Sequence, residues 1–134
     1  MPVAERADRA GDTEEVVLRV PADPAYLTVL RTATAGLAAR LDMTLDEIED
    51  LRIAVDEAAA LLMGGGDEDA QLVAGFTIEP DALSVRVTGP ATTLPEPHSF
   101  AWAVLEALAG EVETGSGDDG SWVLLRHERS LRDR

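Results

Sequence analysis

One amphipathic segment, residues 45–62, constrains the fold more than any other feature of the sequence. Its apolar residues recur at intervals of three and four and fall on one side of a helix: Ile48, Leu51, Val55, Ala58 and Leu62. Thr44 and Glu47 have the spacing of a capping box at the helix start, and the glycines at 64–66 end the helix. Because a helix with a single apolar stripe has to bury that stripe against another layer, this segment predicts a layered domain.

Short β-branched or alternating runs predict the strands of the second layer. They cover residues 16–20, 71–78, 82–88 and 121–126. The second and third runs are separated by only a short turn, so we expect them to form a hairpin. A Gly- and Asp-rich turn over residues 115–120 is expected to lead into the last strand.

Two more helices are predicted beside the central one. The first begins with Asp23 as N-cap and Pro24 in its first turn, and the second begins at Ser99. The order strand, helix, helix, strand, strand, helix, strand predicts an α+β fold: a two-layer sandwich whose mostly antiparallel sheet is covered on one face by about three helices. We expect one domain over residues 14–127, a flexible N-terminal tail over 1–13 and a charged C-terminal tail over 128–134.

The charge balance restricts the partners of the chain. Its 134 residues contain 11 basic and 26 acidic side chains, which gives a formal net charge of −15. A surface of this sign repels phosphate backbones and attracts basic proteins, so we expect a protein partner and no nucleic acid. No run of 18 apolar residues is present, so we expect no membrane association and a cytoplasmic location.

Residues that could carry chemistry are few. The chain has no Cys, which excludes disulfides, thiolate zinc sites and Cys nucleophiles. It has no Lys either, so the three glycines at 64–66 do not form a phosphate loop. His98 and His127 have no Cys partners, and we expect exposed histidines and no metal site. Glu57 could act as a base if it faced a groove between helix and sheet; otherwise it is a solvated acid on an acidic helix.

The segments 41–48 and 51–59 resemble the first half of the anti-sigma-factor kinases of the GHKL ATPase superfamily. The pattern Ser-Phe-x-Trp-x-Val-Leu-x-Ala-Leu-Ala over residues 99–109 is similar to the actinobacterial branch of that family. The resemblance covers about residues 15–126. It implies a protein that sequesters an alternative sigma factor, is captured by a STAS-type anti-anti-sigma protein and forms a homodimer. Arg31, with its neighbours Leu27 and Leu30, would contact these partners.

The same resemblance identifies the positions of the family's nucleotide site. Glu57 would match the catalytic acid, whereas Leu61 stands where the family has a magnesium-binding Asn. Val87 replaces the Asp that binds adenine, so that only Gly89 of that motif is kept, and Ser99–Ala101 replaces a Gly-x-Gly. An aliphatic side chain offers a magnesium-bound triphosphate no oxygen ligand.

We therefore expect no cofactor and an anti-sigma factor that acts by partner exchange rather than by catalysis. The alternative is an active serine kinase of its antagonist, with Glu57 as base and ATP and Mg²⁺ as cofactors. A third possibility is an adaptor that uses the scaffold for an unrelated partner.

Overall fold

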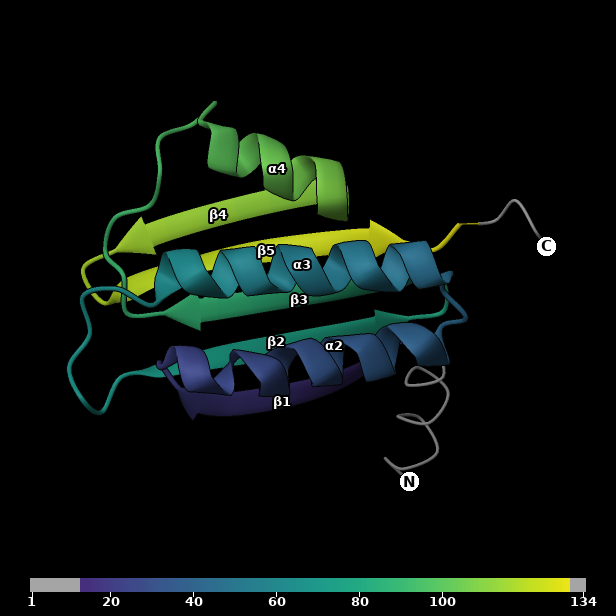
Figure 1. Cartoon of the computed structure of the whole chain (residues 1–134), viewed down its shortest axis with the longest axis horizontal. Coiled ribbons are helices and arrows are strands. Elements are labelled where there is room, and N and C mark those ends of the chain that lie inside the picture. Colours follow the sequence, from purple (N-terminus) through teal and green to yellow (C-terminus); the bar gives the residue numbers. More distant parts are fainter. Residues whose placement is uncertain (1–12, 131–134) are drawn as a thin grey trace, which may run out of the picture.

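Residues 13–130 are described by the computed structural model, and they form an antiparallel sheet with helices on one face (Figure 1). The elements in chain order are β1 (Glu14–Pro21), the 3-10 turn η1 (Pro24–Tyr26), α2 (Leu27–Arg40), α3 (Leu45–Leu62), β2 (Gln71–Glu79), β3 (Ala82–Gly89), α4 (Phe100–Ala109), β4 (Glu111–Gly117) and β5 (Gly120–Glu128). The five strands lie in the order β1-β2-β3-β5-β4. This confirms the predicted two-layer α+β fold.

The helix starts follow the predicted capping signals with two differences. At α3 the capping box is complete, because Glu47 N–H donates to Thr44 Oγ1 at 3.1 Å and Thr44 N–H donates to Glu47 Oε1 at 2.8 Å. Asp23 accepts from Ala25 N–H at 2.8 Å, but the residues it caps form η1, and the α-helix begins only at Leu27. Ser99 has the extended backbone of an N-cap for α4, although its side chain makes no capping hydrogen bond.

The core lies between the helices and the sheet, with α3 at its centre over β3 and β5. Of the predicted apolar stripe, Leu51, Val55, Ala58 and Leu62 are fully buried and Ile48 is partly buried. They pack in a core that includes Phe76, Val85 and Leu125. Because burying one large aliphatic side chain stabilises a fold by about 1.5–3 kcal/mol, this stripe is the main link between the two layers.

One strand is absent from the sequence prediction. Residues 111–117 form β4, the edge strand beside β5, whereas we expected only a turn before the last strand. Most side chains of β4 are Glu, Thr, Ser or Gly, so the segment has no apolar alternation, and its pairing with β5 makes it a strand. The hairpin closes at the pair Gly117 and Gly120.

The last strand is longer than predicted. It reaches Glu128, the first residue of the expected C-terminal tail. Beyond it, Arg129 N–H donates to Asp81 O at 2.8 Å, so Arg129 is held beside the β2–β3 turn. Residues 1–12 of the expected N-terminal tail and 131–134 of the C-terminal tail lie outside the described residues.

The face of the sheet opposite the helices carries both charged and apolar side chains. The guanidinium of Arg86 stacks over the indole of Trp122, with its carbon 4.2 Å from the ring centroid. Gly115 lies directly beneath that indole, since a Cβ there would come within 2.5 Å of Trp122 Nε1. On β1, the edge strand at the other side of the sheet, Val17 is 61% exposed. None of the helices between residues 13 and 130 is long and apolar enough to cross a membrane.

Candidate functional site

Arg31 projects from α2 across to α3, where it pairs with Asp56. Its Nη1 donates to Asp56 Oδ2 at 3.1 Å, and its Nη2 donates to Thr28 Oγ1 at 2.9 Å. The two charged side chains are 34% and 29% exposed, respectively. Asp56 Oδ1 is buried without a hydrogen-bond partner, so the Arg31 contact is the main compensation for placing this carboxylate between the helices. Arg31 is therefore held in one orientation while part of it faces solvent.

The two leucines expected beside Arg31 differ in exposure. Leu27 is half-buried against the core, and Leu30 is fully buried within it. Leu30 therefore supports α2 from below and does not reach the surface. Two other apolar side chains on these helices are exposed, Val29 on α2 (42%) and Ile53 on α3 (41%). Ile53 lies one turn before Asp56, whereas Val29 is two residues from Arg31 and points away from it.

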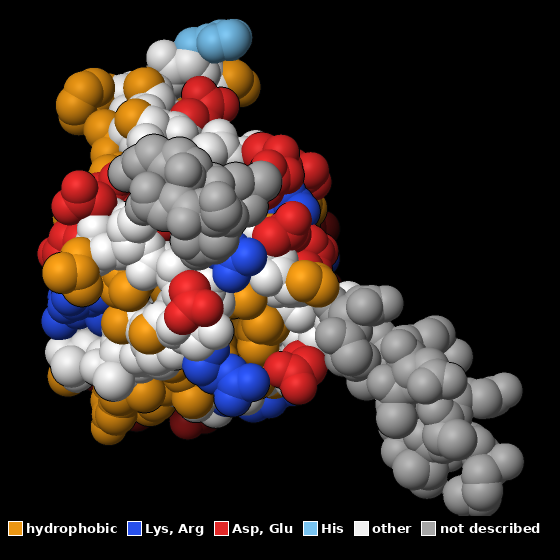
Figure 2. Space-filling model, turned by 90° about the vertical axis from the view of Figure 1, so that its right-hand side faces the viewer, with side chains coloured by type: hydrophobic (Ala, Val, Ile, Leu, Met, Phe, Trp, Pro, Cys, Tyr) orange, Lys and Arg blue, Asp and Glu red, His pale blue; other side chains and the backbone are white. Residues whose placement is uncertain are grey.

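The acidic surface of α3 continues around this pair. Glu57 is exposed on α3 and does not line the cavity found in the described part of the chain. Glu49 accepts from Arg52 at 3.0 Å one turn earlier on the same helix. Figure 2, which views the molecule from the right-hand side of Figure 1, shows acidic groups interspersed with separate arginines rather than a basic patch.

Three of the positions expected to bind nucleotide, Leu61, Val87 and Gly89, lie toward the ends of α3 and β3, whereas Ser99–Ala101 lies at the start of α4. Val87 is fully buried and points into the core, and Leu61 packs against that core. Gly89 lies so close to α3 that a Cβ there would come within 2.5 Å of Leu62 O, and Ala91 N–H donates to the same carbonyl at 3.0 Å. Close packing thus explains Gly89 without any ligand.

These side chains do not fit a magnesium-bound nucleotide. Leu61 and Val87 have no oxygen atoms in their side chains, and Val87 is not accessible. Within residues 13–130, no group of three or more His, Asp or Glu side chains could hold a metal ion. Ser99 Oγ, at the start of α4, is buried and has no partner, but one hydroxyl does not replace a set of carboxylate or amide oxygens.

A second cluster joins the start of α3 to the end of β5. Glu47 Oε2 accepts from Ser130 N–H at 2.8 Å and lies 3.0 Å from His127 Nε2. The other ring nitrogen of His127 lies 3.2 Å from Ala109 O. The tautomer of the ring determines which of these two contacts it donates. His127, with 19% of its side chain exposed, is thus not the exposed histidine expected from the sequence.

The cluster changes the titration of Glu47. Burial by itself would raise the pKa of Glu47. The amide of Thr44, the ring of His127 and the amide of Ser130 all favour the ionised carboxylate, and together they lower its pKa below the usual value. Glu47 therefore acts as a charged clasp between the N-terminus of α3 and the end of the described chain. Sequence spacing revealed its capping box but not its contact with a residue 80 positions away.

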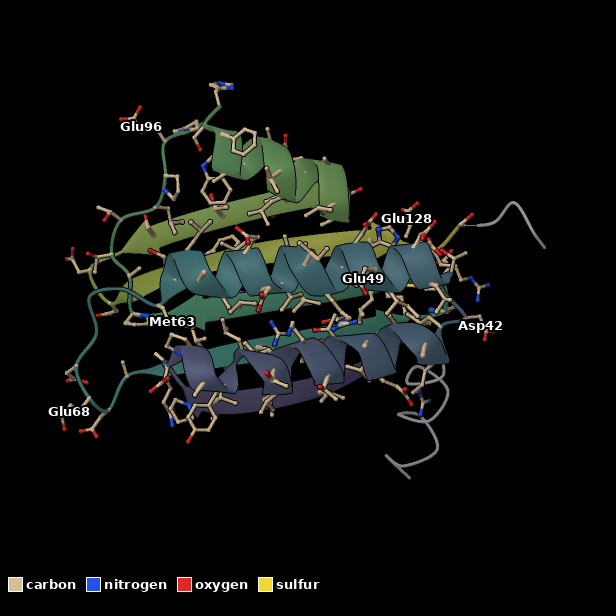
Figure 3. All side chains as sticks on the ribbon, viewed as in Figure 1. Asp42, Glu49, Met63, Glu68, Glu96 and Glu128 are labelled. Atoms are coloured by element: carbon tan, nitrogen blue, oxygen red, sulfur yellow. The ribbon has the colours of Figure 1, made fainter. Side chains whose placement is uncertain are left out.

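A cavity of about 770 Å³ lies at the opposite edge of the molecule, between α4, β4 and residues 94–98. Its apolar lining includes Leu94, Trp102 and Val112. Trp102 Nε1 donates to Pro95 O at 2.9 Å and ties the loop to the helix. In Figure 3, Glu96 lies on this loop, near the start of α4 and away from the helix–sheet core. This cavity could not be predicted from the sequence, because one of its walls is the unpredicted strand β4.

Comparisons with known proteins agree with this fold. No model of a known protein family matches the chain. A serine-protein kinase RsbW from Listeria monocytogenes is 34% identical over 83 residues, which are 60% of this chain and 53% of the relative. An anti-sigma-F factor RsbW from Mycobacterium tuberculosis is 35% identical over 101 residues, which are 74% of this chain and 60% of the relative. The chain is a homologue of the RsbW proteins.

The homology covers only part of those proteins, because the chain spans little more than half the length of the two relatives. A solved structure of the RsbU and RsbW domains of a Mycobacterium tuberculosis protein shares the fold. It superposes with a TM-score of 0.68 at 18% identity and covers 89% of this chain and 33% of that one. This likeness concerns the fold alone.

Proposed function

We propose that the chain is an anti-sigma factor that sequesters an alternative sigma factor in the cytoplasm without consuming ATP. A STAS-type anti-anti-sigma protein would release the sigma factor by exchange. Homology to proteins named RsbW supports the class of function. The observation that favours binding over catalysis is the aliphatic pair at the expected nucleotide site, the buried Val87 and the half-buried Leu61.

The contact surface in this proposal is centred on Arg31. The ion pair with Asp56 fixes the guanidinium at the junction of α2 and α3, so a partner meets a preorganised charge and little side-chain entropy is lost on binding. Ile53, one turn before Asp56 on α3, adds exposed apolar area. Leu27 contributes at the margin, whereas the buried Leu30 is not part of this surface.

The test is a pull-down from the native host, with bound proteins identified and quantified by mass spectrometry. The unmodified chain is expected to retain a sigma factor at physiological salt. Arg31→Ala should reduce its recovery at least fivefold. Arg40→Ala removes the same charge from the same helix at a side chain 69% exposed, so it serves as the matched control and should leave recovery unchanged. Absence of any sigma factor, or equal loss with both variants, would refute the proposal.

The serine-kinase alternative is favoured by the name of the Listeria relative and by the exposed Glu57, which a substrate hydroxyl could reach. Calorimetry with Mg-ATP separates the two functions. The sequestering protein should give no binding heat and no gain in thermal stability at millimolar nucleotide. A ligand that binds only the folded state must raise stability, so saturable heat with a raised Tm would support the kinase.

We also propose a homodimer, as the resemblance implies. The uncovered face of the sheet, with the stacked Arg86 and Trp122 and the exposed Val17, is a surface that a second copy could bury. Sedimentation velocity at micromolar concentration should give twice the mass of one chain. A single monomeric species at the highest soluble concentration would contradict this assembly.

A further inference from the structure

The free edge of β4 forms one wall of the cavity beside α4. Gly117 and Gly120 close a two-residue hairpin, so the residue pairs that exchange hydrogen bonds with β5 fall on the odd-numbered positions of β4. The even-numbered residues therefore direct their backbone N–H and C=O groups away from β5. These residues, Val112, Thr114 and Ser116, also line the cavity. An unpaired row of backbone donors and acceptors thus borders a cavity.

The opposite wall is formed by α4 and the loop before it, which are joined by a hydrogen bond. Helix α4 runs beside β4, which is the outermost strand of the sheet (Figure 1). The hydrogen bond from Trp102 Nε1 to Pro95 O fixes the preceding loop to this helix, and Pro97 restricts the same loop. A strand edge beside a helix, with a preformed groove between them, is the arrangement in which proteins add an extended peptide to a sheet.

The charges around the groove determine which peptide fits. Glu96 and Glu106 line the cavity, and its lining contains no Arg. Glu113 lies on the same edge strand and is exposed. Although a helix N-terminus favours anions, two carboxylates and a net charge of −15 oppose them here. A second copy paired edge to edge would bring the acidic β4 strands together, and like charges on neighbouring strands are destabilising.

We propose that β4 and the groove beside α4 bind an extended basic segment of another protein by strand addition. Its backbone pairs with Val112, Thr114 and Ser116. One apolar side chain enters the cavity against Trp102, and flanking Arg or Lys side chains meet Glu96 and Glu106. The buried hydroxyl of Ser99 gains a hydrogen-bond partner there. This surface is separate from the α2–α3 surface around Arg31.

The probe is a fluorescein-labelled peptide, Arg-Val-Arg-Leu-Arg-Val-Arg, and its binding to the full chain is measured by fluorescence anisotropy. Two further peptides carry N-methyl groups on alternate amides, each in one of the two possible registers. Strand addition predicts saturable binding of the parent peptide and affinities of the two methylated peptides that differ at least tenfold. Equal affinities, or no saturable binding of the parent peptide, would overturn the proposal.

Protein variants locate the site. Thr114→Pro removes one outward N–H and should weaken binding at least tenfold, whereas Thr114→Val keeps the N–H and should bind within twofold of the unmodified chain. Glu106→Gln should weaken binding and reduce its salt dependence, and Glu68→Gln, on an exposed loop, is its control. If circular dichroism shows Thr114→Pro to be unfolded, the affinities of the two methylated peptides for the unmodified chain test strand addition instead. A dimer abolished by Thr114→Pro, without peptide binding, would assign the edge to a second copy and refute the proposal.

Discussion

Replacing Glu47 with Gln tests the clasp that holds α3 to the end of β5. Its carboxylate accepts from the amides of Thr44 and Ser130 and from the ring of His127, and only 13% of the side chain is exposed. Gln has the same shape but turns one of its two acceptor positions into an amino group, which then faces an N–H donor. A hydrogen bond to a charged group contributes about 1.5–3 kcal/mol, and the loss leaves a donor unpaired.

We therefore expect Glu47→Gln to lower the free energy of unfolding by about 2–3 kcal/mol. For a chain of this size, that corresponds to a decrease in Tm of about 8–12 °C. Urea denaturation followed by circular dichroism measures the difference. Glu57→Gln makes the same chemical change at an exposed position of the same helix and should stay within about 0.5 kcal/mol of the unmodified chain.

The pH dependence gives a second readout of the same residue. Because folding lowers the pKa of Glu47, the folded protein holds its proton less tightly than the unfolded chain. The stabilisation is therefore fully present above the unfolded pKa, about 4.3, and is lost as the pH falls through the lower folded value. The difference in stability between the unmodified chain and Glu47→Gln should shrink over that range. A difference that is absent at pH 7, or unchanged down to pH 3, would refute the clasp.

Two further substitutions test the packing around the candidate site. Gly89→Ala should lower the free energy of unfolding by about 2–3 kcal/mol, because its Cβ would come within 2.5 Å of Leu62 O. Gly36→Ala is the control: it lies on α2 with nothing within 4 Å, and it should raise the free energy of unfolding by up to about 1 kcal/mol. Leu30→Ala should cost about 2–5 kcal/mol in urea denaturation because the side chain is fully buried. At a temperature where Leu30→Ala stays folded, the variant should still retain the sigma factor. If it lost binding without being destabilised, Leu30 would have to be part of the contact surface.

Local signals predicted most of the fold. The capping box at Thr44 reflects a contact between residues close in sequence. The apolar stripe on α3 and the alternation in β3 each reflect a face that must be buried. Strand β4 has no such local pattern, because its only large apolar residue is Val112. The segment becomes a strand through its pairing with β5. The cavity was invisible to sequence reasoning for the same reason.

In the candidate site, the sequence allows a prediction only of side-chain exposure that follows from helical periodicity. Leu30 belongs to the apolar stripe of its helix, and helical phase alone places it in the core although its neighbour Arg31 reaches the surface. The pairing of Arg31 with Asp56 joins residues 25 positions apart, and that of Glu47 with His127 joins residues 80 apart. Neither contact leaves a periodic pattern in the sequence, so both required the structure.

The segment from Gly89 to Trp102 is anchored at both ends. Ala91 N–H donates to Leu62 O, Ser121 Oγ donates to Ala91 O at 2.6 Å, and Trp102 binds the loop through Pro95 O. Residues 92–93, between the anchor at Ala91 and the anchor at Pro95, are exposed. A fluorophore attached there would lie between one anchor on α3 and β5 and another on α4. Its signal would therefore report a displacement of α4 relative to the sheet.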